Sequence, residues 1–317
     1  MPVFPKPKFA FDYDVAAERV RLRAHRKKRG IPRRAKDKLL AATWNIANLG
    51  AQERRSQDRE LLAEIIGWFD LVAVQEVREN FGELFDIHQK LPSSYRVLMS
   101  DSAGNNERMA FLYDGRKLEA LEEIGEIAFP PSEYDTIKLE GNPLSFDGFD
   151  RTPYLAAFRF GESSYVFVNV HLFYGTAKPP SVNRRQLETY AVARWSARRQ
   201  KSRFAFTREL VTLGDFNMPK SEPGDAIYDA LTRLGLEVPL HSTQIASSIA
   251  SDANYDQIAF LPGTTQRTFT GLKGVYDFDT VVFPDLWQDG ANRKNFLAYL
   301  RYYLSDHRPM WVQLRTA

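Results

Sequence analysis

Hydrophobic and polar positions alternate along most of the chain in short runs that are typical of β-strands. These runs are rich in β-branched and aromatic residues and are bounded by turn residues. They predict strands at residues 39–45, 71–77, 95–100, 108–114, 154–160, 165–172, 210–217, 255–261 and 310–314.

Other stretches place their apolar residues at helical spacing. They predict helices at residues 53–69, 181–200, 225–236 and 293–304. Pro and Gly punctuate residues 129–150, which predicts an irregular surface loop. Because strands and helices are interspersed without strict alternation, the pattern favours two packed sheets with helices outside them.

The composition narrows the class of protein. No apolar run reaches the roughly 20 residues that span a bilayer, and Lys and Asp interrupt the N-terminal segment where a signal peptide would be apolar. The chain has no cysteine, which excludes disulfides and thiolate metal sites. We therefore expect a cytoplasmic, monomeric protein without a membrane span.

The net charge of +3 hides an asymmetry along the chain. Residues 1–38 hold 13 Lys and Arg against 4 Asp and Glu, whereas the remainder holds 30 against 36. We interpret residues 1–38 as a basic, partly helical N-terminal arm and residues 39–317 as a single domain. The arm either binds a polyanion such as nucleic acid or forms a basic helix that docks on the acidic surface of its own body.

Polar and ionisable side chains gather at the ends of the predicted strands, where the loops of a sandwich cluster and sites usually form. Each of them alone could be an ordinary turn or surface residue. Together they form a pattern that turn chemistry does not require. The residues are Asn45, Glu76, Glu107, Arg151, His171, Asp215, Asn217, Asp256, Asp306 and His307.

The residue types indicate the chemistry. The amides and carboxylates of Asn45, Glu76, Asp215, Asn217 and Asp306 form an all-oxygen set, which suits Mg²⁺, with Mn²⁺ or Ca²⁺ as alternatives.

The two histidines are then free to transfer protons, each with a carboxylate to orient it. Glu107 and Asp256 are available for that role. Arg151 and the Asn amides can donate hydrogen bonds to a phosphate, so the set predicts phosphodiester or phosphomonoester hydrolysis.

Six short motifs resemble the endonuclease/exonuclease/phosphatase superfamily in their order and separation. They are TWN (43–45), VQEV (74–77), NVHL (169–172), GDFN (214–217), YDQI (255–258) and SDH (305–307). The resemblance covers almost everything after the basic arm. It implies a four-layer α/β sandwich, with two mainly antiparallel sheets flanked by helices and the site at one edge of both.

Within the superfamily the sequence is most similar to deoxyribonuclease I, which implies a DNA endonuclease. Glu76 would then be the main metal ligand, with help from Asn45 and Asp306. His171 would pair with Glu107, and His307 with Asp256.

The same resemblance implies further roles. Asp215 and Asn217 would contact the scissile phosphate, a second metal or the attacking water. Arg151 would contact a phosphate, and Arg78 would approach the DNA groove. His307 is favoured as general base and His171 as general acid, with Asp215 as the rival base.

The sequence also departs from that pattern. Ala47 stands where deoxyribonuclease I has an Arg, and Asn105 stands where it has a groove-stacking Tyr. Its signal peptide and disulfides are absent as well. The chemistry therefore carries over better than the mode of DNA binding, and the basic arm is a candidate for replacing the lost groove contacts.

Other functions on the same fold are less consistent with the sequence. Val77 and Arg78 after the Glu argue against abasic-site specificity, and SDANYDQI lacks the Trp and Arg of inositol-polyphosphate phosphatases. A sphingomyelinase-like phospholipase C and a catalytically inactive nucleic-acid-binding module remain as alternatives. Arg184 and Arg185 could line a phosphate groove, but a scaffold helix is favoured.

Overall fold

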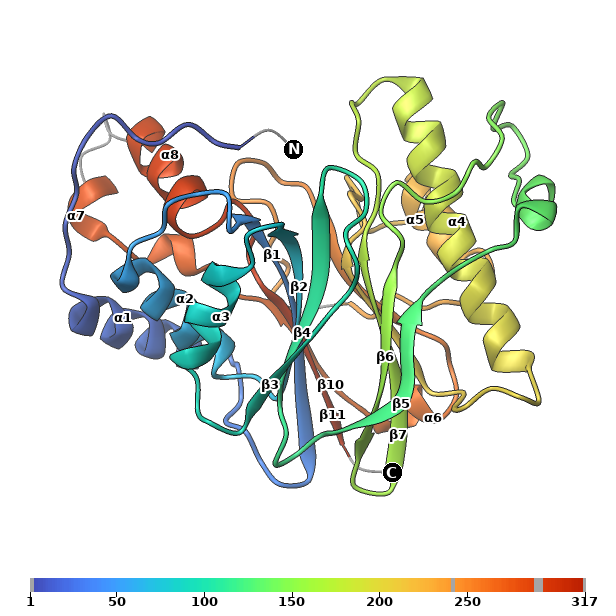
Figure 1. Cartoon of the computed structure of the whole chain (residues 1–317), viewed down its shortest axis with the longest axis horizontal. Helices are drawn as coiled ribbons and strands as arrows, with labels where there is room; N and C mark the ends of the chain where they lie inside the picture. Colours follow the sequence, from blue (N-terminus) through green and yellow to red (C-terminus); the bar gives the residue numbers. More distant parts are fainter. Residues whose placement is uncertain (1–2, 241–242, 288–292, 316–317) are drawn as a thin grey trace.

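The chain folds into two packed β-sheets. The computed structural model describes residues 3–240, 243–287 and 293–315, so residues 1–2 of the predicted arm and residues 316–317 lie outside it. A six-stranded sheet has the order β10-β11-β1-β2-β4-β3, and a five-stranded sheet has the order β5-β6-β7-β8-β9. Helices cover both outer faces, which confirms the predicted four-layer α/β sandwich (Figure 1).

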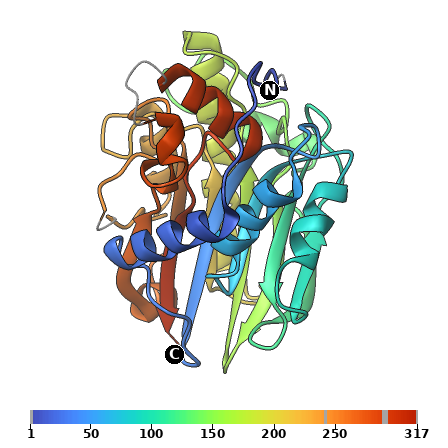
Figure 2. The same cartoon turned by 90° about the vertical axis from the view of Figure 1, so that its left-hand side faces the viewer.

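The six-stranded sheet lies next to most of the helices. Its strands are β1 (Lys38–Leu49), β2 (Leu71–Arg78), β3 (Tyr95–Met99), β4 (Glu107–Asp114), β10 (Phe269–Val275) and β11 (Met310–Arg315). Figures 1 and 2 show the helices that cover its outer face. They are α1 (Val15–Lys28), α2 (Ser56–Ile66), α3 (Gly82–Gln89), α7 (Pro284–Trp287) and α8 (Arg293–Tyr303).

The five-stranded sheet consists of β5 (Glu119–Glu126), β6 (Tyr154–Phe160), β7 (Ser163–His171), β8 (Leu210–Asp215) and β9 (Asp256–Phe260). Its outer face is covered by α4 (Pro179–Lys201) and α5 (Ala226–Thr232) (Figure 1). The shorter elements are η1 (Pro131–Thr136), which lies in the predicted irregular loop, α6 (Thr264–Thr268) and η2 (Phe278–Thr280).

Alternation along the strands builds three hydrophobic cores. In β1, Leu39 and Ala41 face the opposite sheet, whereas Leu40, Ala42 and Trp44 belong to the core beneath the helices. A third core lies between the five-stranded sheet and α4. Since both faces of the central strands are buried, their registers are fixed and their ends are held in place.

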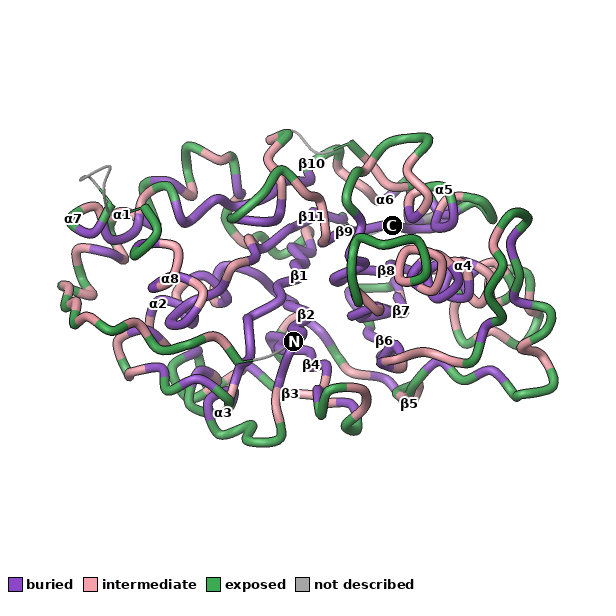
Figure 3. The backbone as a smooth tube through the Cα atoms, turned by 90° about the horizontal axis from the view of Figure 1, so that it is seen from above, coloured by how far each residue is buried: buried purple, intermediate pink, exposed green. Residues whose placement is uncertain are grey.

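Two parallel strand pairs put their ends at the same edge of the molecule. Strand β1 runs parallel to β2, with Asn45 opposite Gln75, and β7 runs parallel to β8, with His171 opposite Asp215. The carboxyl ends of parallel neighbours meet at one edge. Figure 3 looks down on that edge and shows these strands buried at the centre, among exposed loops.

Strands β5 and β10 were not predicted, whereas the other two edge strands, β3 and β9, were. Each lies at the outer end of its sheet. Half of the residues in the sequence EALEEIGE of β5 are charged, and FTGLKGV of β10 contains two glycines. Edge strands often carry charge that discourages pairing with other chains, and these two sequences lack the apolar signal of the central strands.

The basic arm contains α1 and is tied to the body by ion pairs. The Asp14 carboxylate caps the helix by accepting from the Ala16 N–H at 2.8 Å. Several arginines of the arm pair with body carboxylates, as the docking interpretation predicts: Arg19 and Arg23 with Glu64, Arg29 with Asp277, and Arg34 with Asp70 and Asp114. Among the described residues, no helix has the length and apolarity to cross a bilayer.

Candidate active site

Asn45 and Glu76 bring the carboxyl ends of β1 and β2 into the site. The Asn45 Nδ2 donates to Glu76 Oε1 and to Asp215 Oδ2, both at 3.0 Å, so one amide links the two sheets. Glu76 has a φ of 62° within an irregularity of the β2 register. The Asn48 N–H donates to Glu76 Oε2 at 2.8 Å and fixes the carboxylate in this orientation.

A buried polar network lies directly behind these two residues. Gln75 Nε2 donates to Asn169 Oδ1 at 2.6 Å and to Thr43 Oγ1 at 3.0 Å. Asn169 Nδ2 in turn donates to the carbonyls of Val74 and Ala110. Sequence reasoning missed this network, although the alternation that places Thr43, Gln75 and Asn169 on inward-facing positions could have revealed it.

His171 ends β7 and is oriented by a carboxylate. Its Nδ1 lies 2.9 Å from Glu107 Oε2, and its Nε2 lies 3.7 Å from Asp215 Oδ2. Burial alone would raise the pKa of Glu107, but His171 and the nearby arginines lower it to about 2. Glu107 is therefore ionised at neutral pH and favours the His171 tautomer with its proton on Nδ1.

Arg151 braces the main chain around His171. Its buried guanidinium donates to the carbonyls of His171 and Leu172, both at 2.8 Å, and to Asp150 Oδ2 at 2.9 Å. The Arg151 guanidinium, which was predicted to contact a phosphate, thus donates to acceptors of the protein itself. Its effect on the site is to hold His171 in position.

Arg78 is also engaged with groups of the site. Its guanidinium donates to Asn48 Oδ1 at 2.5 Å and lies 3.4 Å from Glu107 Oε1. It also lines a hollow beside the site, with Asn105 and Asn106. The predicted groove residue therefore supports Glu107 while remaining at the rim.

Asp215 occupies the centre of the site. Gly214, with a φ of 144°, lets β8 approach β7 closely, because a Cβ there would lie 2.1 Å from the Val170 carbonyl oxygen. Asp215 Oδ1 accepts from the Asn217 N–H at 2.8 Å. Burial alone would raise the pKa of Asp215, but the flanking histidines and the Asn45 and Asn217 hydrogen bonds lower it below its ordinary range.

Asn217 adopts the left-handed conformation, with a φ of 51°. Its Nδ2 donates to the Leu172 carbonyl at 2.8 Å, which connects the ends of β7 and β8. Arg185, from α4, donates to the Asn217 carbonyl at 2.6 Å and is 2% exposed, so it supports the site from behind and does not lie on the solvated basic face that the scaffold interpretation expects. Asn217 therefore lies next to Asp215, with its amide held by the main chain.

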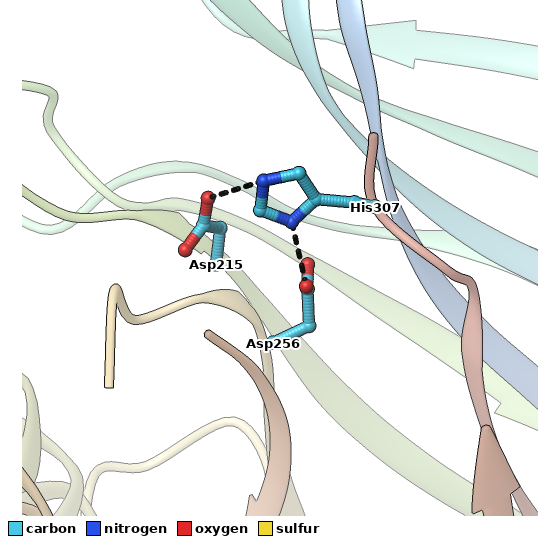
Figure 4. A group of neighbouring side chains, drawn as sticks. All are labelled: Asp215, Asp256 and His307. Atoms are coloured by element: carbon cyan, nitrogen blue, oxygen red, sulfur yellow. Dashed lines mark hydrogen bonds and ion pairs between the residues drawn. The ribbon is translucent and has the colours of Figure 1, made fainter. Parts of the chain in front are cut away.

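His307, from the loop before β11, lies between Asp215 and Asp256 (Figure 4). Its Nδ1 lies 2.7 Å from Asp256 Oδ2, and its Nε2 lies 3.9 Å from Asp215 Oδ2. Burial opposes the charged ring, but Asp256 and Asp215 raise the pKa of His307 well above its ordinary value. Ser305 fixes the loop, since its Oγ accepts from the His307 N–H and donates to the Asn45 carbonyl.

The oxygens around Glu76 fit a divalent cation. Burial raises the pKa of Asp306 and the nearby Glu76 carboxylate adds to the rise, whereas His307 opposes it. The buried Asn45 Oδ1 has no hydrogen-bond partner within the described parts of the chain. Two close carboxylates and an unused amide oxygen are suitable donors for Mg²⁺, Mn²⁺ or Ca²⁺.

A second set of ligand atoms lies within 4.8 Å of one another, on Asp215, Asp256 and His307. Here the Asp256–His307 hydrogen bond already uses two of the groups. Both sets are therefore candidate cation ligands, and in the Asn45, Glu76 and Asp306 set the Asn45 Oδ1 has no hydrogen bond in the described parts of the chain.

Two hollows flank the site and meet at Asn105. One, of about 560 Å³, lies beside His171 and is lined by Asp150, Phe173 and Tyr174 as well. The other, of about 420 Å³, lies beside Arg78 and reaches Val3. The edge is therefore open on both sides of the Glu107–His171 pair.

The comparisons with known proteins give structural neighbours alone, since neither a family model nor a curated protein matches the sequence. TDP2 from D. rerio, complexed with a single strand DNA product, has a TM-score of 0.55 and 16% identity over 88% of this chain and 99% of its own. Bacteroides thetaiotaomicron mannosyl-6-phosphatase has a TM-score of 0.53 and 17% identity over 88% and 100%.

A third neighbour is an endonuclease/exonuclease/phosphatase from Bacteroides vulgatus. Its TM-score is 0.56 and its identity 16%, over 89% of this chain and 100% of its own. At such low identities the likeness concerns the fold. The chain therefore has the fold of the endonuclease/exonuclease/phosphatase proteins, and its function has to be argued from its own side chains.

Proposed function

We propose that the chain is a divalent-metal-dependent phosphodiesterase that cleaves DNA as an endonuclease. The observation that carries this proposal is the convergence of two histidines on one carboxylate. His171 and His307 direct their Nε2 atoms toward Asp215 Oδ2, and each ring has its other nitrogen next to a carboxylate. Such a pair can donate to a phosphate lying between the rings while the carboxylate receives a proton.

A divalent cation held by Glu76, Asn45 and Asp306 would neutralise charge on a phosphate oxygen. Asp215, which its surroundings keep ionised, accepts the proton of the attacking water. His307 lies between two carboxylates that favour its charged form, so it serves as a donor to the phosphate. This environment favours Asp215 over His307 as the base.

His171 completes the arrangement as the donor on the other side. Glu107 holds its Nδ1 and leaves its Nε2 directed at the substrate position. One of the two rings then protonates the departing oxygen. Most of the acceleration comes from positioning and from stabilisation of the transition-state charge.

The shape of the edge supports a diester as the substrate. Because the two hollows continue on either side of the Glu107–His171 pair, a polymer can extend past the scissile phosphate in both directions. Among the structural neighbours, one holds a single strand DNA product and another is named a phosphatase. Both names are consistent with phosphoester chemistry on this fold.

Nicking of supercoiled plasmid tests the proposal. We expect conversion to open circles with Mg²⁺ and none with EDTA. His171→Ala should reduce the rate by about 10² to 10⁴, because a positioned acid or base typically contributes that much. His88→Ala, which removes a histidine from α3, is the matched control and should cleave normally.

Other results would redirect the assignment. An intact plasmid together with hydrolysis of phosphomonoesters, phospholipids or RNA would remove the DNA endonuclease and keep a phosphoesterase. Cleavage that persists in EDTA, or a loss below tenfold for both His171→Ala and His307→Ala, would contradict the metal and the histidines respectively.

A further inference from the structure

The loop after His171 carries two aromatic side chains into the larger hollow. Residues 172–178 join β7 to α4 at the top of the molecule (Figure 1). Phe173 and Tyr174 are half-buried and line the hollow of about 560 Å³ together with His171. A ligand part adjoining a phosphate at His171 would therefore lie against these rings.

Buried side chains of α4 hold this loop rigidly. Glu188 is fully buried and accepts from the Phe173 N–H at 3.0 Å. Arg185 donates to the carbonyls of Tyr174 and Thr176 at 3.2 and 3.1 Å. The main chain that presents the rings is thus fixed from behind, which favours a preformed surface.

The rings themselves are also held. The Arg184 guanidinium lies 4.2 Å from the centre of the Phe173 ring, and that of Arg185 lies 5.0 Å from the Tyr174 ring. Gly175 has a φ of 61°, and a Cβ there would lie 2.6 Å from the Phe173 ring. The loop therefore needs glycine at this position to accommodate the ring.

The aromatic surface continues to the second histidine. Tyr174 meets the Tyr255 ring edge-on, with 6.1 Å between centroids, and Tyr255 lies 5.9 Å from the His307 ring. Aromatic faces thus border the site from the His171 side to the His307 side.

The charges in this hollow disfavour a second phosphate. Arg151 donates to two carbonyls and to Asp150, and Arg184 is paired with Asp150 and Glu188. Arg151, the arginine that lines the hollow, is therefore already bonded to protein acceptors, as is Arg184 next to Phe173, and the Asp150 carboxylate also lines the hollow. The ligand part that fits is uncharged and flat.

We propose that Phe173 and Tyr174 form a stacking platform for the nucleobase next to the scissile phosphate. Every base has a π-face, so the platform would accept any sequence and would select nucleotides over other phosphate esters. The Asn105 amide, in the same hollow, can contact a base edge. This inference rests on the proposed function, because the platform acts only on a phosphate bound at His171.

Ligand binding tests the platform without requiring turnover. Isothermal titration with Mg²⁺ compares thymidine 5′-monophosphate with 2-deoxyribose 5-phosphate, which lacks the base. We expect the nucleotide to bind roughly five- to a hundredfold more tightly, the usual range for one stacked base. Phe173→Leu and Tyr174→Leu, which keep apolar volume but remove the ring, should bring this ratio close to one.

A matched control is available on the far end of α4. Phe204 is 82% exposed and stacks with Arg203 at 4.6 Å, so Phe204→Leu removes a similar aromatic–arginine contact outside the hollow. Its binding ratio should equal that of the parent protein. Melting temperatures of all three variants establish that the fold is retained.

The outcomes separate the two proposals. Equal binding of both ligands by the parent protein, or a ratio that survives both Leu substitutions, overturns the platform alone. If neither ligand binds, there is no phosphate site at His171, and this result contradicts both the proposed function and the platform. A ratio lost in the two loop variants and kept in Phe204→Leu supports the platform.

Discussion

Glu76 shows how a single residue is held in an unfavourable conformation for the benefit of the site. A φ of 62° is uncommon for a residue with a long side chain, and such positions typically cost about 1 to 3 kcal/mol. The irregular β2 register and the Asn48 hydrogen bond hold it there. The result is a carboxylate that points at the sheet edge, where alternation along β2 alone would not place it.

Lys273 is a titratable residue that the proposed chemistry does not use. It lies on β10, is fully buried, and donates from Nζ to the carbonyls of Pro239 and Ile258 at 2.9 and 3.1 Å. Burial lowers its pKa to about 7. At neutral pH Lys273 is therefore only partly protonated in the folded protein, whereas it is almost fully protonated in the unfolded chain.

This difference predicts that stability rises with pH above neutrality. Between pH 7 and about 10, the unfolded state binds more protons at Lys273 than the folded state, so alkali favours folding. We expect the unfolding free energy to gain about 1 to 2 kcal/mol from this residue between pH 7.5 and 9. Urea denaturation of the parent and of Lys273→Met at both values measures it, and identical slopes in the two proteins would contradict the buried charge.

Which residues form the site was easier to predict than what they contact. Asn45, Glu76, His171, Asp215, Asp256 and His307 lie together because they end or precede strands that meet at one edge, and strand ends are visible in a sequence. The partners of Arg151 were not visible. A long side chain can reach acceptors that only the tertiary structure brings near. Arg151 in this way donates to the carbonyls of His171 and Leu172.

At the scale of elements, the segment after α1 is attached through one buried charge cluster. Arg34 donates to Asp70 Oδ1 at 2.5 Å, to the Tyr95 hydroxyl at 3.1 Å and to Asp114. Asp70 is fully buried and also accepts from the Leu40 N–H and from Lys117. These contacts connect the arm to the starts of β1 and β2 and to the end of β4.

Arg34→Ala should therefore destabilise the whole protein. It leaves two largely buried carboxylates with less compensation, since Asp70 keeps only Lys117 and Asp114 keeps only the more distant Arg116, at 3.5 Å. We expect the unfolding free energy to fall by about 2 to 4 kcal/mol, as for other broken buried pairs. Arg33→Ala, one residue away and exposed, is the control and should change it by less than about 0.5 kcal/mol. Equal stability of the two variants in urea would show that the cluster contributes nothing.

Prediction of the elements succeeded where both faces of a strand are buried. The central strands carry long apolar runs, and their predicted bounds agree with the structure to within a few residues. The edge strands β5 and β10 contain charged residues or glycines that weaken the apolar pattern. The edge strands β3 and β9 keep that pattern and were predicted. Helix α3 was not predicted either, because it is short and several of its positions are exposed, so its apolar pattern is weak.

At the scale of the molecule, the site exists because two sheets end at the same edge. Asn45 and Glu76 come from one sheet and His171 and Asp215 from the other, and the Gln75–Asn169 bond fixes the sheets relative to each other just behind them. The order of the strands was not readable from the sequence, since it depends on pairings far apart in the chain. The resemblance to a known superfamily implied the sandwich and the position of the site, and the structure gives the strand order.

The position of the basic arm also belongs to this scale. Figure 1 shows α1 on the flank of the six-stranded sheet, away from the edge that carries the site. Its paired arginines are engaged with body carboxylates, and Lys27, Lys28, Arg33 and Lys36 are exposed on that flank. By contrast, Lys178 and Lys220 are exposed in the loops that follow β7 and β8 at the edge itself.

DNA binding should therefore depend on the edge lysines and not on the exposed basic residues in and just after α1. In a His171→Ala background with Mg²⁺, anisotropy of a short fluorescent duplex gives the slope of log affinity against log salt. Replacing Lys178 and Lys220 with Ser should reduce this slope by about 0.9 for each lost phosphate contact. Replacing Lys27, Lys28, Arg33 and Lys36 together should leave it within experimental error, because α1 lies on the flank away from that edge (Figure 1). The opposite result, a flattened slope in the fourfold variant and an unchanged slope in the double variant, would contradict this prediction. The DNA would then lie along the arm, and the arm would replace the missing groove contacts.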